Sequence, residues 1–293
     1  MSDQPGGLLG WWRRLSGSPG PGGRTRGYPT SGNRASSMHL FWDLPGRFVE
    51  VSVTVTILDE PRADDLYFWA LQVGFEEAAS GRREGAAHTG PQWAAQHPGH
   101  GAVHWGGYGA QGELDGGPGW LPSASGNANS GRLPVAGRRS YRLTVSRAPD
   151  GPQRSDGPSG AAAPPGFTAW RSTITPLPAA PDRSAGGEST PQVIRDLWAP
   201  GDLLVSPMVW SEVFARCDAD PVRVAWSDPV GLDERGRRHP ATSATVNYQA
   251  VTDGGCSNTN VVAMMIEGGP AWVQATGSER VTPQGTRLPL DPR

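Results

Sequence analysis

The sequence predicts an all-β protein, built as a sandwich of antiparallel strands. From Val49 to Ile57, β-branched apolar residues alternate with polar ones, which is the period of a strand with one buried and one solvated face. The segment Leu66–Phe75 repeats this pattern with larger side chains. About a dozen short segments of this kind, separated by turn residues and with no helical pattern or internal repeat, indicate a sandwich or barrel.

The expected strands cover most of the chain between its ends. We expect strands at 39–44, 49–57, 66–75, 88–93, 102–109, 140–147, 167–175, 193–198, 208–215, 222–226, 244–251, 261–266 and 271–276. Pro91 has no backbone N–H to donate, so we expect its strand to lie at a sheet edge or to carry a bulge.

Composition divides the chain into a core and loose segments. Apolar residues make up 36% of the chain, and its 41 glycines and 29 prolines gather in a few stretches that cannot bury enough apolar surface to fold. We therefore expect disordered tails at 1–37 and 277–293, and two low-complexity insertions at about 148–166 and 176–190. The remainder, 38–276, is expected to form one domain.

Charge and hydropathy exclude several classes of partner. The net charge is -2 and all 26 basic residues are arginine, with no basic stripe, so we expect no nucleic-acid partner. No apolar run approaches the ~20 residues of a membrane span. The N-terminus also lacks the apolar run of about 7–15 residues of a secretory signal, so the default expectation is a cytoplasmic protein, or a secreted one if the start is mis-called.

The two cysteines, Cys217 and Cys256, leave two possibilities open. They form a disulfide if their loops meet at one end of the sandwich, whereas a reducing compartment would oppose that bond. They cannot form a structural zinc site by themselves.

The stretch from Leu66 to Gly109 is rich in aromatic and amide side chains that suit a sugar ligand. Tryptophan and tyrosine rings can stack on the apolar faces of sugars, and amides can bind their hydroxyl groups. The alternative is that most of these rings are core residues. The candidate ligand-binding residues are Gln72, Gln92, Trp93, Trp105, Tyr108 and Asn127.

Glu212 is the candidate catalytic carboxylate. Met208, Trp210 and Phe214 share its face of the predicted strand, and apolar neighbours raise the pKa of a carboxyl group, as a general acid requires. The alternative is an ion pair with Arg195 or Arg223. A second carboxylate is not identified, because the pattern that begins at Glu113 has proline where its last glutamate belongs.

Other catalytic arrangements are absent. His97, His100 and His104, with His88 nearby, have helical spacing but stand among prolines and glycines, so we expect a solvated turn and no metal site. No nucleophile elbow is present, and a lysine-free chain has no phosphate-binding loop of the Walker type. We therefore expect no cofactor.

The segments LYFWALQVGF, WGGYG, FTAWRSTIT and MVWSEVFARCDADPVRVAWSD carry a family resemblance. Over roughly 38–265, the chain resembles a group of uncharacterised proteins from high-GC bacteria that are similar to the domain-of-unknown-function 3472 family. The resemblance implies a jelly-roll-like, concanavalin-like β-sandwich of the lectin and glucanase type. It implies no activity and no catalytic residue.

Three functional hypotheses follow. The first is a non-catalytic, lectin-like module that binds a glycan. The second is a polysaccharide-active glycoside hydrolase that uses Glu212 and a partner carboxylate. The third is a structural or protein-binding domain without a small-molecule site.

Overall fold

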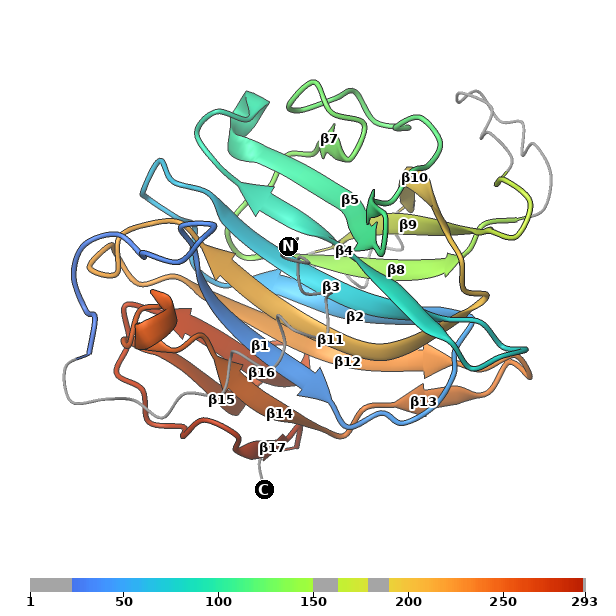
Figure 1. Ribbon diagram of the computed structural model, residues 1–293. Coiled ribbons are helices and arrows are strands. Elements are labelled where there is room, and N and C mark those ends of the chain that lie inside the picture. The colour runs from blue at the N-terminus through green and yellow to red at the C-terminus, as the bar shows by residue number, and fades with distance from the viewer. Residues whose placement is uncertain (1–22, 150–162, 179–189, 292–293) are drawn as a thin grey trace, which may run out of the picture.

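The computed structural model describes residues 23–149, 163–178 and 190–291, which form two antiparallel sheets packed face to face (Figure 1). This architecture confirms the predicted β-sandwich. The expected disorder at 1–22 and within the two insertions falls on 1–22, 150–162 and 179–189, which lie outside the described residues. The described part of the chain contains no helix with the length and apolar character that a membrane span requires.

The larger sheet has nine strands and lies in front in Figure 1. They are β1 (Ser36–Trp42), β3 (Tyr67–Glu76), β4 (Arg83–Trp93), β5 (Gly101–Gly109), β6 (Gly112–Glu113), β7 (Ser130–Arg132), β11 (Leu203–Val213), β14 (Ser243–Tyr248) and β17 (Arg287–Pro289). Their order is β17-β14-β1-β11-β3-β4-β5-β6, and β7 also pairs with β5.

The smaller sheet has eight strands and lies behind the larger one. They are β2 (Glu50–Ile57), β8 (Arg139–Arg147), β9 (Thr168–Leu177), β10 (Gln192–Ala199), β12 (Arg223–Leu232), β13 (Arg238–Pro240), β15 (Thr259–Ile266) and β16 (Gly269–Thr276). Their order is β10-β9-β8-β2-β12-β16-β15, and β13 pairs with β12. Short 3₁₀ turns at Pro98–His100 and Val251–Asp253 complete the described elements.

The core lies between the sheets and follows the predicted alternation. The apolar residues of β2 from Val51 to Ile57 are fully buried, and so is the odd-numbered face of β3. Several indole rings fill the middle and are also fully buried: Trp69, Trp105, Trp170, Trp226 and Trp272. Trp105 Nε1 donates to the carbonyl oxygen of Trp170 at 3.1 Å, which links β5 to β9 across the core.

One buried amide bridges the two sheets. Gln274 of β16 has no exposed surface. Its Oε1 accepts hydrogen bonds from Ser211 Oγ at 2.5 Å and from Trp226 Nε1 at 2.9 Å. Its Nε2 donates to the carbonyl oxygen of Met38 at 2.9 Å. Met38 and Ser211 are register partners on β1 and β11. This single side chain therefore links β16 of the smaller sheet to two neighbouring strands of the larger sheet.

A disulfide joins Cys217 and Cys256, whose Cα atoms lie 5.6 Å apart. The two loops therefore meet, and of the two possibilities that the sequence left open, the disulfide is the one that forms. The backbone N–H of Cys217 donates to Gly27 O at 2.8 Å, and that of Cys256 donates to Ser36 Oγ at 2.9 Å. The bonded loops thus hold both the segment that precedes β1 and the first residue of β1.

Both predicted tails contribute more structure than we expected. Thr30 N donates to Gly254 O at 3.0 Å, so the segment before β1 packs on the domain although its composition is typical of a loose tail. At the other end, β17 pairs with β14. Long-range hydrogen bonds of this kind leave no local sequence pattern.

Pro91 is also placed differently from the expectation, because β4 is an interior strand between β3 and β5. The β3–β4 register skips Gly90 and Pro91, so the missing N–H falls where that ladder is interrupted.

The sheet edges differ in how far they are covered. The larger sheet ends in very short strands, β6 on one side and β17 on the other. On the smaller sheet, β10 is covered by a neighbouring segment, since Trp198 N donates to Asp115 O at 2.9 Å and Trp120 N donates to Ile194 O at 2.8 Å. The opposite edge is β15.

We expect Gln274→Met to destabilise the protein by about 3 kcal/mol or more, because it leaves several buried polar groups without partners. Chemical denaturation followed by circular dichroism measures the change. Gln111→Met, at an exposed turn, should stay within about 0.5 kcal/mol of the wild type. Equal effects of the two substitutions would contradict the bridging role of Gln274.

Candidate functional site

The outer face of the larger sheet, which points away from the core and toward the viewer in Figure 1, carries the candidate site. On β11, Val209 and Val213 point into the core, so Trp210 and Glu212 point outward. On β3, Gln72 points outward by the same alternation.

Four aromatic rings pack against one another on this face, and we call them the ring cluster: Phe68, His88, His104 and Trp210. Phe68 lies edge-on to Trp210, with ring centroids 4.9 Å apart, and edge-on to His104 at 5.4 Å. His88 stacks on His104 at 5.2 Å and contacts Trp210 at 5.4 Å. The rings thus form a closed loop across β3, β4, β5 and β11.

Small residues beneath the ring cluster make room for it. Ala70 is fully buried among the rings. A Cβ atom on neighbouring Gly90 would lie 1.9 Å from Trp69 O and 3.0 Å from Ala70 Cα, so no larger residue fits there. The close approach of the two backbones therefore requires glycine.

Gln72 is fixed beside the ring cluster with its amide nitrogen unused. Its Oε1 accepts a hydrogen bond from Trp210 Nε1 at 3.0 Å. Its Nε2 donates to none of the residues that the structure describes, and the side chain is half-buried. His88, the register partner of Gln72, likewise makes no side-chain hydrogen bond to a described residue. Two oriented polar groups therefore face outward beside apolar rings.

Burial keeps the histidines of this face neutral. Desolvation lowers the pKa of His88 to about 4 and that of His39, opposite Trp210, also to about 4. Desolvation first, and then the charges of His88 and Arg195, lower the pKa of His104 well below 6.5. Ser130 lies 3.2 Å from His104 Nδ1 and fixes that ring. At neutral pH the imidazoles can thus both donate and accept hydrogen bonds.

Glu212 lies at one end of the same face. Its Oε1 accepts a hydrogen bond from Asn33 Nδ2 at 2.6 Å. Burial raises the pKa of its carboxyl group, while hydrogen bonds from Asn33 and Ser37 partly oppose the shift. This is the direction predicted from the sequence. Among the described residues, the groups that shift the pKa of Glu212 through hydrogen bonds are Asn33 and Ser37, and neither is an acid.

The alternative ion pairs of Glu212 do not form. Arg223 is hydrogen-bonded to Asp59, with Nε and Oδ2 2.6 Å apart. Arg195 donates instead to Asn129 Oδ1.

The sequence-predicted ligand residues divide between the two faces. Trp105 is fully buried in the core, so the expectation that its ring stacks on a ligand is corrected. Trp93 packs at the border of the core and stacks on His100. Gln92 shares the outer face with Gln72 and lies opposite Phe68.

Tyr108 and Asn127 lie at the margins of that face. Tyr108 has 53% of its surface exposed, near the end of β5. Asn127 belongs to an exposed turn and accepts a hydrogen bond from Asn129 N at 2.8 Å. The outer face therefore combines Gln72 and Gln92 with the ring cluster, rather than with Trp93 and Trp105.

The alternation of residues along two strands could have identified half of the ring cluster from the sequence. Phe68 and Trp210 occupy the face opposite the core residues of their strands. What the sequence does not show is the register that brings His88 and His104 beside them. His97 and His100 lie in a separate turn, and among the described residues no group of three or more potential metal ligands occurs.

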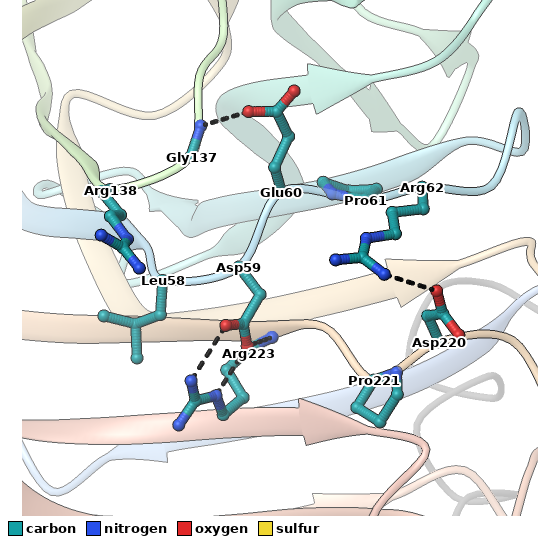
Figure 2. A pocket seen from close by; sticks show the side chains of 10 residues that line it. All are labelled: Leu58, Asp59, Glu60, Pro61, Arg62, Gly137, Arg138, Asp220, Pro221 and Arg223. Atoms are coloured by element: carbon teal, nitrogen blue, oxygen red, sulfur yellow. Dashed lines mark hydrogen bonds and ion pairs between the residues drawn. The ribbon is translucent and has the colours of Figure 1, made fainter.

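A second candidate region is an open depression of about 750 Å³ beside the smaller sheet (Figure 2). Its charged side chains largely pair with one another. Asp59 binds Arg223, and Arg62 lies 3.6 Å from Asp220. Glu60 accepts a hydrogen bond from the backbone N–H of Gly137 at 3.3 Å. Because these groups already have partners, the depression is a weaker candidate than the outer face.

Comparison with known proteins adds little about the site. No protein-family model and no curated protein match the chain. A structure of scytalido-glutamic peptidase with a peptide-based transition-state analogue is similar over 83% of this chain and 98% of that one, with a TM-score of 0.40 and 10% identity. SCP-B, an eqolisin-family peptidase in complex with the tripeptide Ala-Ile-His, is similar over 85% and 99%, with a TM-score of 0.35 and 9% identity. At these values the similarity supports neither a shared site nor a shared activity.

Protonation of His88 is expected to destabilise the fold in acid. The pKa of His88 is about 4 in the folded protein against 6.5 ordinarily, so the unfolded chain binds more protons between these values. The stability that neutral His88 contributes is complete above pH 6.5 and is lost as the pH falls toward 4. Thermal unfolding at stepped pH should show a shallower loss for His88→Gln than for the wild type.

Other groups also titrate in this range, so the difference between variant and wild type is the quantity of interest. His100→Asn, in the exposed turn outside the ring cluster, is the control and should retain the wild-type slope. Identical slopes for wild type and His88→Gln would show that His88 is not held neutral.

Proposed function

We propose that the protein is a non-catalytic glycan-binding module and that its ligand lies on the outer face of the larger sheet. One observation carries the proposal. The Nε2 group of Gln72 and the imidazole of His88 have no described hydrogen-bond partner, and they stand beside the rings of Phe68 and Trp210. Phe68 and Trp210 are only 5% and 7% exposed, so the rings fix the positions of these polar groups, and the polar groups make the contacts with the sugar.

The electrostatics favour a ligand with uncharged hydroxyl groups. His39, His88 and His104 are neutral at pH 7 because burial lowers their pKa values. Neutral imidazoles and amides both donate and accept, as hydroxyl groups do. A charged ligand would gain little from this part of the face.

The arrangement of the strands favours an extended ligand. His88, Gln72, Met208 and Phe41 are successive register partners across β4, β3, β11 and β1. Neighbouring strands are about 4.8 Å apart, so this row spans roughly 14 Å. Phe41, Gln72 and His88 are partly exposed in this row, whereas Met208 is buried. An oligosaccharide lying across the strands could contact the row at these three partly exposed members.

Hydrolysis of the glycan is the second candidate function, because Glu212 has the raised pKa of a general acid. Glycosidases of the usual kind need a second carboxyl group about 5–9.5 Å from the first. The described surroundings of Glu212 supply hydrogen bonds from Asn33 and Ser37 instead. Binding without hydrolysis therefore agrees better with the site.

We expect Gln72→Ala to weaken glycan binding about tenfold, which corresponds to the loss of one hydrogen bond at a partly buried site. Isothermal titration with neutral cello-, xylo-, laminari- and chito-oligosaccharides measures the affinity. Gln111→Ala, which removes an amide from an exposed turn, is the matched control and should bind like the wild type. Circular dichroism checks that Gln72→Ala, which deprives Trp210 Nε1 of its acceptor, remains folded. If no glycan binds the folded wild type, or if both variants weaken binding equally, the proposal fails.

A second prediction separates binding from hydrolysis. Wild-type protein should release no reducing ends from a bound oligosaccharide, and Glu212→Gln should bind within about twofold of the wild type, because the amide oxygen can still accept from Asn33. A reducing-end assay on both proteins is the test. Release by the wild type that disappears in Glu212→Gln would establish the hydrolase instead.

A further inference from the structure

A groove of about 720 Å³ extends the outer face at the end where β1 leaves the larger sheet. We call it the arginine groove, and it is lined by Phe41, Arg83, Ser206 and Arg287 together with the turn at 42–46. Phe41 opposes Met208, and Met208 opposes Gln72, so the groove lies two strands, or roughly 10 Å, from Gln72.

Both arginines of the groove are held in place through one nitrogen only. Arg83 Nε donates to Glu76 Oε2 at 2.7 Å, and Arg287 Nε donates to Asp43 Oδ2. The Nη groups of these two side chains donate to no residue that the structure describes. Each guanidinium is thus oriented by its carboxylate while its terminal nitrogens stay available for a planar, bidentate partner.

The charges around the groove do not balance. Arg47 Nε also contacts Glu76, at 2.5 Å from Oε1, so three guanidinium groups face the two carboxylates of Glu76 and Asp43. Hydrogen bonds from Arg83 and Arg287 lower the pKa values of these carboxyl groups, which therefore stay ionised. One positive charge is left in excess, whereas the ring cluster nearby is neutral.

A residue with a strained backbone conformation also lines the groove. Ser206 has a φ of 49°, in the left-handed region that residues other than glycine rarely adopt, and its side chain is exposed. It lies in the irregularity that interrupts the β11–β3 register between Val205 and Met208. Bulges often re-aim side chains beside binding sites, and strained residues cluster at such sites.

We infer that the arginine groove binds the carboxylate of an acidic sugar residue in the same glycan chain whose neutral residues lie on the ring cluster. This inference rests on the proposed function and names its substrate class, a glycan that contains uronic acid. Arg83 and Arg287 take the carboxylate through their free Nη groups, and the Ser206 hydroxyl can bind a neighbouring sugar hydroxyl.

The test compares a neutral xylo-oligosaccharide that carries one glucuronic acid residue with the methyl ester of the same oligomer, which keeps the ring hydroxyl groups and loses the charge. We expect the acid to bind the wild type about tenfold more tightly, with an advantage that shrinks in high salt. The double variant Arg83→Gln, Arg287→Gln should bind both oligomers with the affinity that the wild type has for the ester.

The chain offers a matched control. Arg82 neighbours Arg83 in sequence but pairs with Glu77 and Glu84 and does not line the groove. Arg82→Gln should therefore keep the preference for the acid. The arginines of the groove have 65% and 70% of their side-chain surface exposed, so the double variant is expected to fold, as circular dichroism will show.

The outcomes separate this inference from the function on which it rests. If acid and ester bind the wild type equally and Gln72→Ala weakens both, the glycan site stands and the arginine groove is refuted. If the acid alone binds, and its binding depends on Arg83 and Arg287 but not on Gln72, the groove is a carboxylate site and the glycan-binding function is refuted.

Discussion

The hydrogen bonds of Gln274 are the interaction on which the site depends most directly. A buried amide is costly unless all its partners are present, and here they come from three other strands, β1, β11 and β12. Ser211 stands between Trp210 and Glu212 in the sequence, and Met38 stands between Ser37 and His39. Gln274 therefore fixes β1 and β11 from the core side at Met38 and Ser211. The residues next to these two in the sequence point to the outer face.

The two faces of the central strands have different physical roles. Inward residues of β3 and β11 fill the core, whereas the outward ones are aromatic and polar groups that the core does not need. The outward set is neutral over the ring cluster and positive at the arginine groove. Phe41 and Gln72 are partly exposed and stand on either side of buried Met208 in one register row, so a single extended ligand can reach both kinds of surface.

Local pattern was sufficient for the fold and insufficient for the site. Alternation in β2 and β3 predicted strands, faces and core, because the period of two is a property of each strand alone. It also predicted the raised pKa of Glu212. The prediction that Trp105 binds a ligand was wrong, because the sequence of an alternating strand does not show which of its two faces is buried until its partner strands are known. The partnership of His88 with Trp210, and the interior place of Pro91, depend on register between distant segments, which the sequence does not encode locally.

The edges of the sandwich determine how it can meet another chain. An unpaired row of N–H and C=O groups is a template for an added strand, and very short edge strands offer little of it. The larger sheet ends in β6 and β17, with two and three residues, and β10 of the smaller sheet is covered. Within the described residues, β15 remains as an eight-residue edge, with Met264 and Met265 exposed by 40% and 59%. Among the described edges, β15 therefore offers the longest template for an added strand, and it belongs to the smaller sheet, whereas the ring cluster and the arginine groove lie on the larger one.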